Sequence, residues 1–127
     1  MLSTSRLQSI IWTSRLDEAQ RFYRDMLGLA LKGESDGALV FDVSGSDLRV
    51  SPIPSTTPTE HTVLGFSVPD VASVVTVLTD RGIVFERFSG FPHGPDGILT
   101  TPGGSKVAWF RDPDGNLLSV VQFPQHQ

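Results

Sequence analysis

The spacing of apolar residues in the first half of the chain predicts a strand followed by a helix. Residues 7–13 are rich in side chains that favour extended backbone. From Leu16 to Leu27 apolar residues then lie three or four positions apart, a spacing typical of a helix with one apolar face; they are Leu16, Ala19, Phe22, Tyr23, Met26 and Leu27. We expect the helix to end at Gly28, because glycine readily adopts the left-handed conformation that follows many helices.

The second half of the chain repeats this order. Residues 63–68 predict another strand, and Asp70 is a suitable N-cap because its carboxylate can accept a hydrogen bond from the first turn. The apolar stripe from Val71 to Leu78 predicts a second helix that ends at Arg81-Gly82. Prolines in residues 53–60 cannot donate to a strand ladder, so this segment is interpreted as a linker. We therefore expect one domain over residues 1–127, with module 1 at 1–52 and module 2 at 61–127.

An internal repeat relates the two halves residue by residue. When Gly45 is matched to Gly115, a shift of 70 residues (115 − 45), Arg49 falls opposite Ser119. The strands that precede the helices match with a shift of 55 (68 − 13). Residues 88–104, rich in glycine and proline, absorb the difference as a loop present only in the second half. The further predicted strands are 29–34, 37–43 and 47–51 in the first half and 83–88, 106–111 and 116–123 in the second. One helix covers only one face of each sheet, so the other face is expected to stay open and concave.

Composition excludes several classes of function. The chain has 127 residues, of which 39% are hydrophobic, enough for a globular domain with a core. Its net charge of -4 lacks the basic surface that nucleic-acid binding requires. The absence of cysteine excludes disulfides and thiolate metal sites. No apolar run approaches the roughly twenty residues of a membrane span, so we expect a soluble cytoplasmic protein with no membrane partner.

Three motifs resemble those of a known family. FYRDMLGL at 22–29, VPDV at 68–71 and WFRDPDGNLL at 109–118 resemble the vicinal oxygen chelate superfamily, which contains glyoxalase I, bleomycin-resistance proteins and extradiol dioxygenases. The resemblance covers nearly the whole chain. It implies an α+β fold of two βαβββ modules, in which a curved mixed β-sheet surrounds a cup-shaped cavity and the helices lie on the outer face.

In metal-using members of this family, four ligands come from the first and last strands of the two modules. The resemblance places four residues at these positions, namely Gln8, Arg49, Val63 and Ser119. Divalent metals in such centres take imidazole and carboxylate ligands. Gln8 is the only one of the four that is a plausible ligand, because Arg49 is a permanent cation, Val63 has no lone pair and Ser119 is a poor neutral donor. We therefore expect no metal and no cofactor.

Each of these residues also has an ordinary structural explanation. Gln8 is either a ligand contact or a polar residue near a terminus. Ser119 leaves space for a ligand rather than acting as a nucleophile, since no histidine is positioned to activate it. A buried Arg49 must be paired or face a ligand, and the sequence leaves open a salt bridge to Asp47 or Glu60 and an anion-binding role.

Strand alternation extends the set of residues expected to face the cavity. The predicted ligand-binding residues are Gln8, Ile10, Trp12, Arg49, Ser51, Val63, Gly65, Ser67, Trp109, Ser119 and Val121. The residues between them, such as Ile11 and Leu118, are expected to pack under the helices. Trp12 and Trp109 are either apolar walls of a small-molecule site or core residues.

The remaining candidates lie on predicted loops and strand ends. His61, His93 and His126 are isolated in the sequence and are expected to be solvated. Residues 91–97 either close over the cavity as a lid or form a loose surface loop, in which Asp96 is a possible acid or base.

These observations leave two classes of function. The first is a metal-free protein whose cup binds a small acidic or aromatic molecule, with Arg49 as counter-ion. The second is a lyase, isomerase or dioxygenase-type enzyme that either holds a metal or uses Arg49 to stabilise an oxyanion. Whether the chain is an enzyme, and which residues would be catalytic, the sequence does not decide. Members of the family often pair modules across a two-fold axis, so the resemblance also implies a homodimer.

Overall fold

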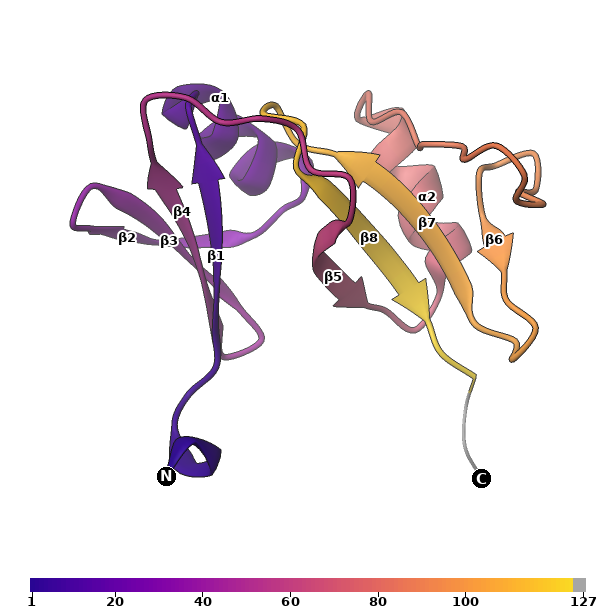
Figure 1. Cartoon of the computed structure of the whole chain (residues 1–127), viewed down its shortest axis with the longest axis horizontal. Coiled ribbons are helices and arrows are strands. Elements are labelled where there is room, and N and C mark those ends of the chain that lie inside the picture. The colour runs from indigo at the N-terminus through magenta and orange to yellow at the C-terminus, as the bar shows by residue number, and fades with distance from the viewer. Residues whose placement is uncertain (125–127) are drawn as a thin grey trace. The chain divides into compact units, whose positions relative to one another are not determined.

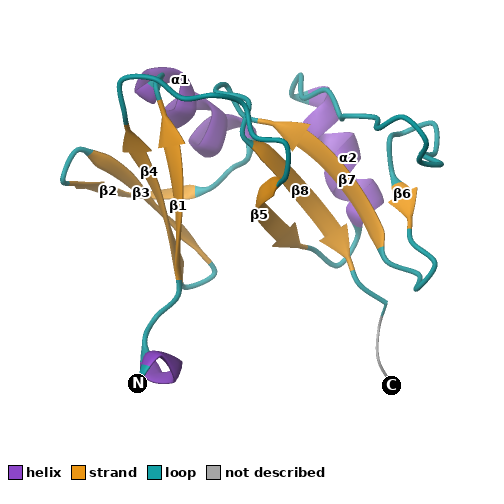
Figure 2. Ribbon diagram, viewed as in Figure 1, coloured by secondary structure: helices purple, strands orange, loops and turns teal. Residues whose placement is uncertain are grey.

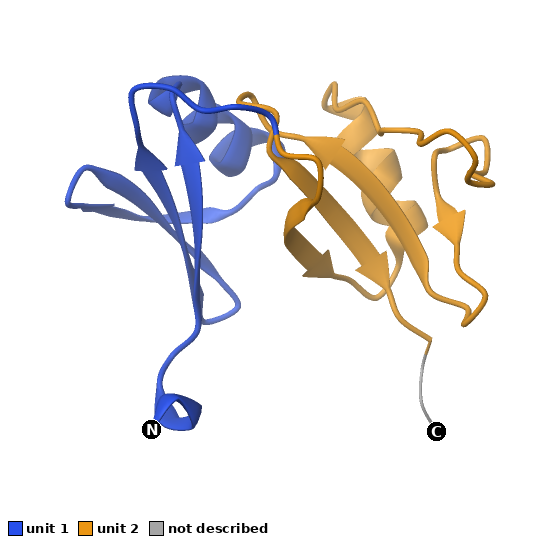
Figure 3. Cartoon of the chain, in the orientation of Figure 1, with its two compact units in different colours: residues 1–58 blue, residues 59–127 orange. Residues whose placement is uncertain are grey.

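The computed structural model describes residues 1–124 and confirms the predicted α+β class, with two βαβββ modules (Figure 1). The chain divides into two compact units, Met1–Pro58 and Thr59–Gln127 (Figure 3). The boundary falls inside the segment predicted as a linker. No helix within the described residues has the length and apolar character of a transmembrane segment.

Unit 1 consists of a four-stranded mixed sheet, one interrupted helix made of α1 and η2, and the short 3₁₀ helix η1 before the first strand (Figure 2). Its elements in chain order are η1 (Leu2–Thr4), β1 (Gln8–Thr13), α1 (Leu16–Gln20), η2 (Arg21–Met26), β2 (Ala30–Ser35), β3 (Ala38–Val43) and β4 (Ser46–Pro52). The strand order is β1-β4-β3-β2, with β1 parallel to β4 and the other pairs antiparallel.

Unit 2 has the same topology. Its elements are β5 (Thr62–Ser67), α2 (Val71–Asp80), β6 (Leu99–Thr100), β7 (Lys106–Arg111) and β8 (Leu117–Gln122). The strand order is β5-β8-β7-β6, and β5 is parallel to β8.

The strand registers confirm the internal repeat. Ile10 pairs with Arg49 in unit 1, and Gly65 pairs with Ser119 in unit 2. These pairs reproduce the predicted shifts of 55 (65 − 10) and 70 (119 − 49). Strand β3 matches β7 with a shift of 69 instead, because the turn 113–115 between the strands of the second hairpin has one residue more than its counterpart 44–45.

The first helix departs from the regular helix that the sequence predicts. It continues from α1 into the π-helical turn η2, in which the Leu27 amide bonds the carbonyl of Phe22, five residues earlier. The wider turn allows two consecutive aromatic residues, Phe22 and Tyr23, to be buried together, with ring centroids 5.1 Å apart. The helix ends as expected at Gly28, which has a φ of 74°.

The second helix forms as predicted. The Asp70 side chain caps it by accepting a hydrogen bond from the Ala72 amide at 3.1 Å. Val71, Val75 and Leu78 are buried against the sheet of unit 2, and Gly82 adopts a φ of 93° just beyond the helix.

The predicted strand at 83–88 is wrong. The segment lies beside β7, but among the described residues it makes one backbone hydrogen bond to that strand. The Glu86 amide donates to the Trp109 carbonyl at 2.7 Å. The edge of the sheet is completed instead by β6, a two-residue strand inside the region predicted as a loop. The insertion between residue 88 and β6 thus divides one edge strand into two short pieces.

Candidate functional site

In unit 1, strand alternation places the five predicted site residues on the sheet face opposite the helix, called here the open face of unit 1. They occupy neighbouring strands, with Gln8, Ile10 and Trp12 on β1 and Arg49 and Ser51 on β4. The register pairs Ile10 with Arg49 and Trp12 with Ser51. Ile10 and Trp12 are 55% and 59% exposed, whereas Ile11 between them is 3% exposed.

The side chain of Arg49 extends away from β1. Its Nη2 donates a hydrogen bond to the carbonyl of Ser35 at 2.9 Å, so the side chain crosses β3 toward the end of β2. Asp47 pairs with Lys32 instead, with Nζ and Oδ1 2.9 Å apart. The possible salt bridge between Arg49 and Asp47 is therefore not formed, because a bulge in β2 at Lys32 brings a nearer cation to the carboxylate.

Cations outnumber carboxylates around Asp47 in unit 1. Three cations, Arg6, Lys32 and Arg49, act on Asp47, and its cross-strand partner Asp42 adds a second carboxylate. The hydrogen bond from Lys32 is the main cause that holds the pKa of Asp47 below its ordinary value, and the charges of Arg6 and Arg49 act in the same direction. This local excess of cations around Asp47 favours an anion over a cation.

In unit 2, the open face is likewise the sheet face opposite α2. It carries Gly65 and Ser67 from β5, Ser119 and Val121 from β8, and Trp109 from β7. Ser119 lies between Gly65 and Trp109 in the register.

Val63 does not follow the simple alternation on which its prediction rests. It lies at a bulge in β5, between Thr62, which pairs with Leu117, and Leu64, which pairs with Leu118. Val63 is 38% exposed and has no partner in the ladder.

The side chain of Ser119 packs against the backbone of Gly65 on the neighbouring strand. Ser119 is 8% exposed, and a Cβ added to Gly65 would lie 3.1 Å from its Oγ. The missing side chain at position 65 therefore leaves the space that the hydroxyl group fills. No histidine within residues 1–124 hydrogen-bonds Ser119, so the geometry offers no activating base.

The structure holds Trp109 in a cluster that the sequence did not predict. Its Nε1 donates to Thr62 Oγ1 at 3.1 Å, and the rings of Phe88 and His93 pack edge-on against the indole with centroids 5.3 and 6.0 Å away. Thr62, Phe88 and His93 come from β5 and the insertion, which the sequence does not bring together. The indole of Trp109 is consequently half-buried and fixed in orientation.

His93 is not the solvated residue that the sequence suggests. Its Nε2 accepts a hydrogen bond from the Phe88 amide at 3.1 Å, and because an amide can only donate, the ring proton must lie on Nδ1. Nδ1 then donates to the carbonyl of Gly97 at 2.8 Å. His61 is exposed as expected, and His126 lies outside the described residues.

The segment 91–97 is tied down rather than loose. The Gly94 amide donates a hydrogen bond to the carbonyl of Ile98 at 2.8 Å, and Arg87 Nη2 donates one to the carbonyl of Pro95 at 2.5 Å. Asp96 Oδ1 accepts from the Ile98 amide at 3.1 Å, which is a turn-capping contact. Closure of this segment as a lid stays a prediction.

The residues at the family's metal positions do not fit a divalent metal. They provide an amide in Gln8, a guanidinium in Arg49, an aliphatic group in Val63 and a hydroxyl in Ser119, and none of these is a carboxylate or an imidazole. Within residues 1–124, no group of three or more His, Asp or Glu side chains is arranged to hold a metal ion. No step of a reaction is therefore assigned to a metal.

Comparison with known proteins supports the fold and its family. The sequence profile of the Glyoxalase/Bleomycin resistance protein/Dioxygenase superfamily matches residues 6–120. No curated protein matches the sequence.

Several solved structures share the fold. Lactoylglutathione lyase from Agrobacterium tumefaciens superposes with a TM-score of 0.73 at 20% identity, covering 94% of this chain and 93% of that one. The glyoxalase family protein from Enterococcus faecalis gives a TM-score of 0.73 at 19% identity, covering 95% and 99%. A glyoxalase/bleomycin resistance protein/dioxygenase from Alicyclobacillus acidocaldarius gives 0.70 at 20% identity, covering 96% and 93%. Identities this low establish a common fold and leave the chemistry to be argued from the site.

Proposed function

Because the chain belongs to the Glyoxalase/Bleomycin resistance protein/Dioxygenase superfamily, we propose that it binds a small acidic or aromatic molecule without a metal ion. The observation that carries this proposal is the guanidinium of Arg49 at a position where metal-using members of the family have a ligand, with Arg6 and Lys32 also acting on the neighbouring Asp47. The binding residues proposed for unit 1 are Trp12, Ile10 and Arg49, with Gln8 and Ser51 beside them.

The geometry of unit 1 supports recognition of an aromatic acid. The exposed indole of Trp12 offers a flat apolar surface to a ring. A guanidinium has five N–H donors, and Arg49 uses one of them in its bond to the Ser35 carbonyl. A carboxylate can therefore accept from the others without displacing that bond, in the charge-assisted geometry that arginine favours.

The test is a substitution that removes only the cation. Arg49→Met keeps most of the aliphatic stem, so we expect isothermal titration to show that binding of benzoate and phenylacetate is abolished, while the melting temperature falls only by the effect of losing the Ser35 hydrogen bond. The matched control is Arg87→Met in unit 2, since Arg87 also donates to a single backbone carbonyl, that of Pro95. Unchanged affinity of Arg49→Met for both acids would refute the role of Arg49.

The metal-free part of the proposal has its own test. Protein purified without chelators should contain no stoichiometric zinc, nickel, iron or manganese by elemental analysis. Added divalent metals should leave the melting temperature unchanged, because a specific site at one hundred times its Kd would stabilise the fold by about 2.7 kcal/mol. A bound metal, or a shift of that size, would contradict this part.

A catalytic function is the second candidate, and the same guanidinium favours it. A metal-free enzyme of the lyase, isomerase or dioxygenase type would use Arg49 to stabilise a developing oxyanion. This second candidate function predicts that the bound acid is converted to a product. Mass spectrometry of the ligand after incubation with the protein would detect that product. Recovery of unchanged ligand supports binding alone.

We also propose that the protein is a cytoplasmic homodimer. Members of the family often pair modules across a two-fold axis, and Phe123, which is 58% exposed just after β8, offers an apolar side chain outside the proposed binding residues for such a contact. Sedimentation equilibrium should give twice the mass of the chain. A monomer across the micromolar range would contradict the dimer.

A further inference from the structure

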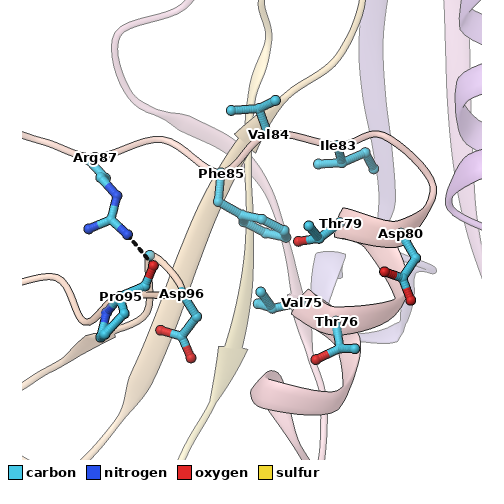
Figure 4. Close-up of a pocket in the computed structure, with 11 residues that line it drawn as sticks. Val75, Thr76, Thr79, Asp80, Ile83, Val84, Phe85, Arg87, Pro95 and Asp96 are labelled. Carbon is cyan, nitrogen blue, oxygen red and sulfur yellow. Dashed lines mark hydrogen bonds between the residues drawn. The ribbon is translucent and has the colours of Figure 1, made fainter.

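A cavity lies in unit 2, on the helix side of the sheet and therefore away from its open face. Its volume is about 450 Å³, and it lies between α2 and the segments around residues 83–87 and 95–97 (Figure 4). The floor is apolar and is formed by Val75, Ile83 and Phe85. Val75 and Ile83 are 4% and 5% exposed, so the floor is part of the packed core rather than a mobile surface. The volume falls in the range of small-molecule sites, and the cavity is open to solvent on its polar side.

The rim of this cavity is polar and carries an excess of negative charge. Asp80 and Asp96 line it together with one cation, Arg87, so the ionised side chains sum to one negative charge. Figure 4 shows the two carboxylates on either side of Phe85 and Val75. Arg87 is already engaged, because it donates to the carbonyl of Pro95.

Asp80 occupies a place where its charge is unfavourable. It is the last residue of α2, where the helix dipole presents negative charge; no residue within the last turn is basic, and the C-cap Arg81 that follows is the nearest cation in the sequence. Within residues 1–124 the Asp80 carboxylate makes no ion pair. Asp96 uses Oδ1 to accept from the Ile98 amide, which leaves its second oxygen available. A cation on this rim would therefore meet two carboxylates and the negative end of a helix, against one guanidinium, that of Arg87, which is engaged with the Pro95 carbonyl.

We propose that this cavity binds a small organic cation, namely an apolar body that carries one protonated amine. The apolar body lies on Val75, Ile83 and Phe85, and the ammonium group lies at the acidic rim. The charge balance favours an organic cation over an organic anion, and the apolar floor favours an organic amine over a hydrated metal ion. This inference is independent of the proposed function, because it uses none of the residues of either open face.

The test uses benzylamine as the probe and follows backbone amides of the whole chain by ¹H–¹⁵N correlation NMR. Titration should shift the amides of residues 75–87 and 95–97. Benzyl alcohol, which has the same ring without the charge, and benzoate, which has the opposite charge, should bind at least several-fold more weakly. Raising the salt concentration should weaken benzylamine binding, since the carboxylates are accessible to solvent.

Two isosteric substitutions test whether the rim carboxylates of Asp80 and Asp96 bind the ammonium group. Asp80→Asn and Asp96→Asn should each reduce the affinity for benzylamine by about two- to fivefold, the range of exposed ion pairs. Asn at 96 retains an oxygen to accept from Ile98, so the turn is preserved. The matched control is Asp36→Asn, which makes the same charge change at an exposed turn of unit 1 where φ is 51° and asparagine is tolerated.

The outcomes separate cleanly. Loss of affinity in the two rim variants with no loss in Asp36→Asn supports the proposal. Equal binding of benzyl alcohol and benzylamine, equal loss in all three variants, or no shift at residues 75–87 and 95–97 would overturn it. Unchanged amide positions elsewhere in the spectrum confirm that the variants are folded.

Discussion

The contact between Gly65 and Ser119 gives a quantitative prediction about the open face of unit 2. Gly65→Ala places a Cβ 3.1 Å from Ser119 Oγ, a few tenths of an ångström closer than ordinary packing. The φ of Gly65 is not in the left-handed region, so alanine is allowed by the backbone. Replacing glycine inside a strand with alanine stabilises a protein by about 0.5–1 kcal/mol when space permits. Overpacking of this kind costs about 1 kcal/mol at the lower end of its range, so the single variant should be close to neutral or slightly destabilised.

Removal of the hydroxyl group should release the strain. In a Ser119→Ala background, Gly65→Ala should stabilise the protein by about 0.5–1 kcal/mol, which gives a coupling energy of roughly 1 kcal/mol in a double-mutant cycle. Urea unfolding of the four proteins measures it. Gly103→Ala is the control, because the nearest atom to its added Cβ is 4.0 Å away. Additivity of the Gly65 and Ser119 changes within about 0.3 kcal/mol would refute the steric argument.

Three further predictions follow from the contacts of unit 2. Arg111→Met should lower the free energy of unfolding by roughly 2 kcal/mol, because Arg111 pairs with Glu86 at 2.8 Å and also donates to the carbonyls of Thr59 and Gly115. Urea unfolding measures this loss, and a free energy equal to that of the wild type within error would contradict it. His93→Leu should release Trp109 toward solvent and red-shift its fluorescence in a Trp12→Phe background, whereas an unchanged spectrum would show that the Phe88 contact alone fixes the indole. The pKa of Asp70 is lowered, chiefly by the hydrogen bond from Ser73, so its carboxylate stabilises the fold above the pKa of the unfolded chain. That contribution should be lost as the pH falls through the lower folded pKa, and Asp70→Ala should flatten the acid side of the stability profile.

The repeat was predictable because both halves use the same local chemistry. Gly45 and Gly115 both adopt left-handed backbone in their turns, with φ of 89° and 83°, and a side chain at either position would be strained. Matching these glycines therefore fixed the register of β4 against β8, and the Ile10–Arg49 and Gly65–Ser119 pairs confirm it. Apolar periodicity gave the second helix for a similar reason, since its cap and its end are both local features.

The edge of the second sheet was not predictable, because its contacts are not local. Residues 83–88 have the alternation of a strand, yet the insertion that follows turns Arg87 toward the Pro95 carbonyl and Phe88 toward the Trp109 indole. The place of the third strand is then taken by β6, eleven residues later (99 − 88). Sequence spacing carries no information about which of two segments pairs with β7 when both are apolar.

On the open face of unit 1, strand alternation predicted the face on which Arg49 lies, and it did not predict the position of its guanidinium. Parity along a strand fixes the face on which a Cβ lies, and it placed Arg49 correctly beside Ile10. It does not fix the position of a charge at the end of a long side chain, and here the guanidinium lies across β3 at the Ser35 carbonyl. A ligand that contacts both Arg49 and Trp12 must therefore reach from β1 across β4 toward β3. This geometry favours an elongated acid over a compact one, so phenylacetate should bind more tightly than benzoate in the titrations proposed for Arg49→Met.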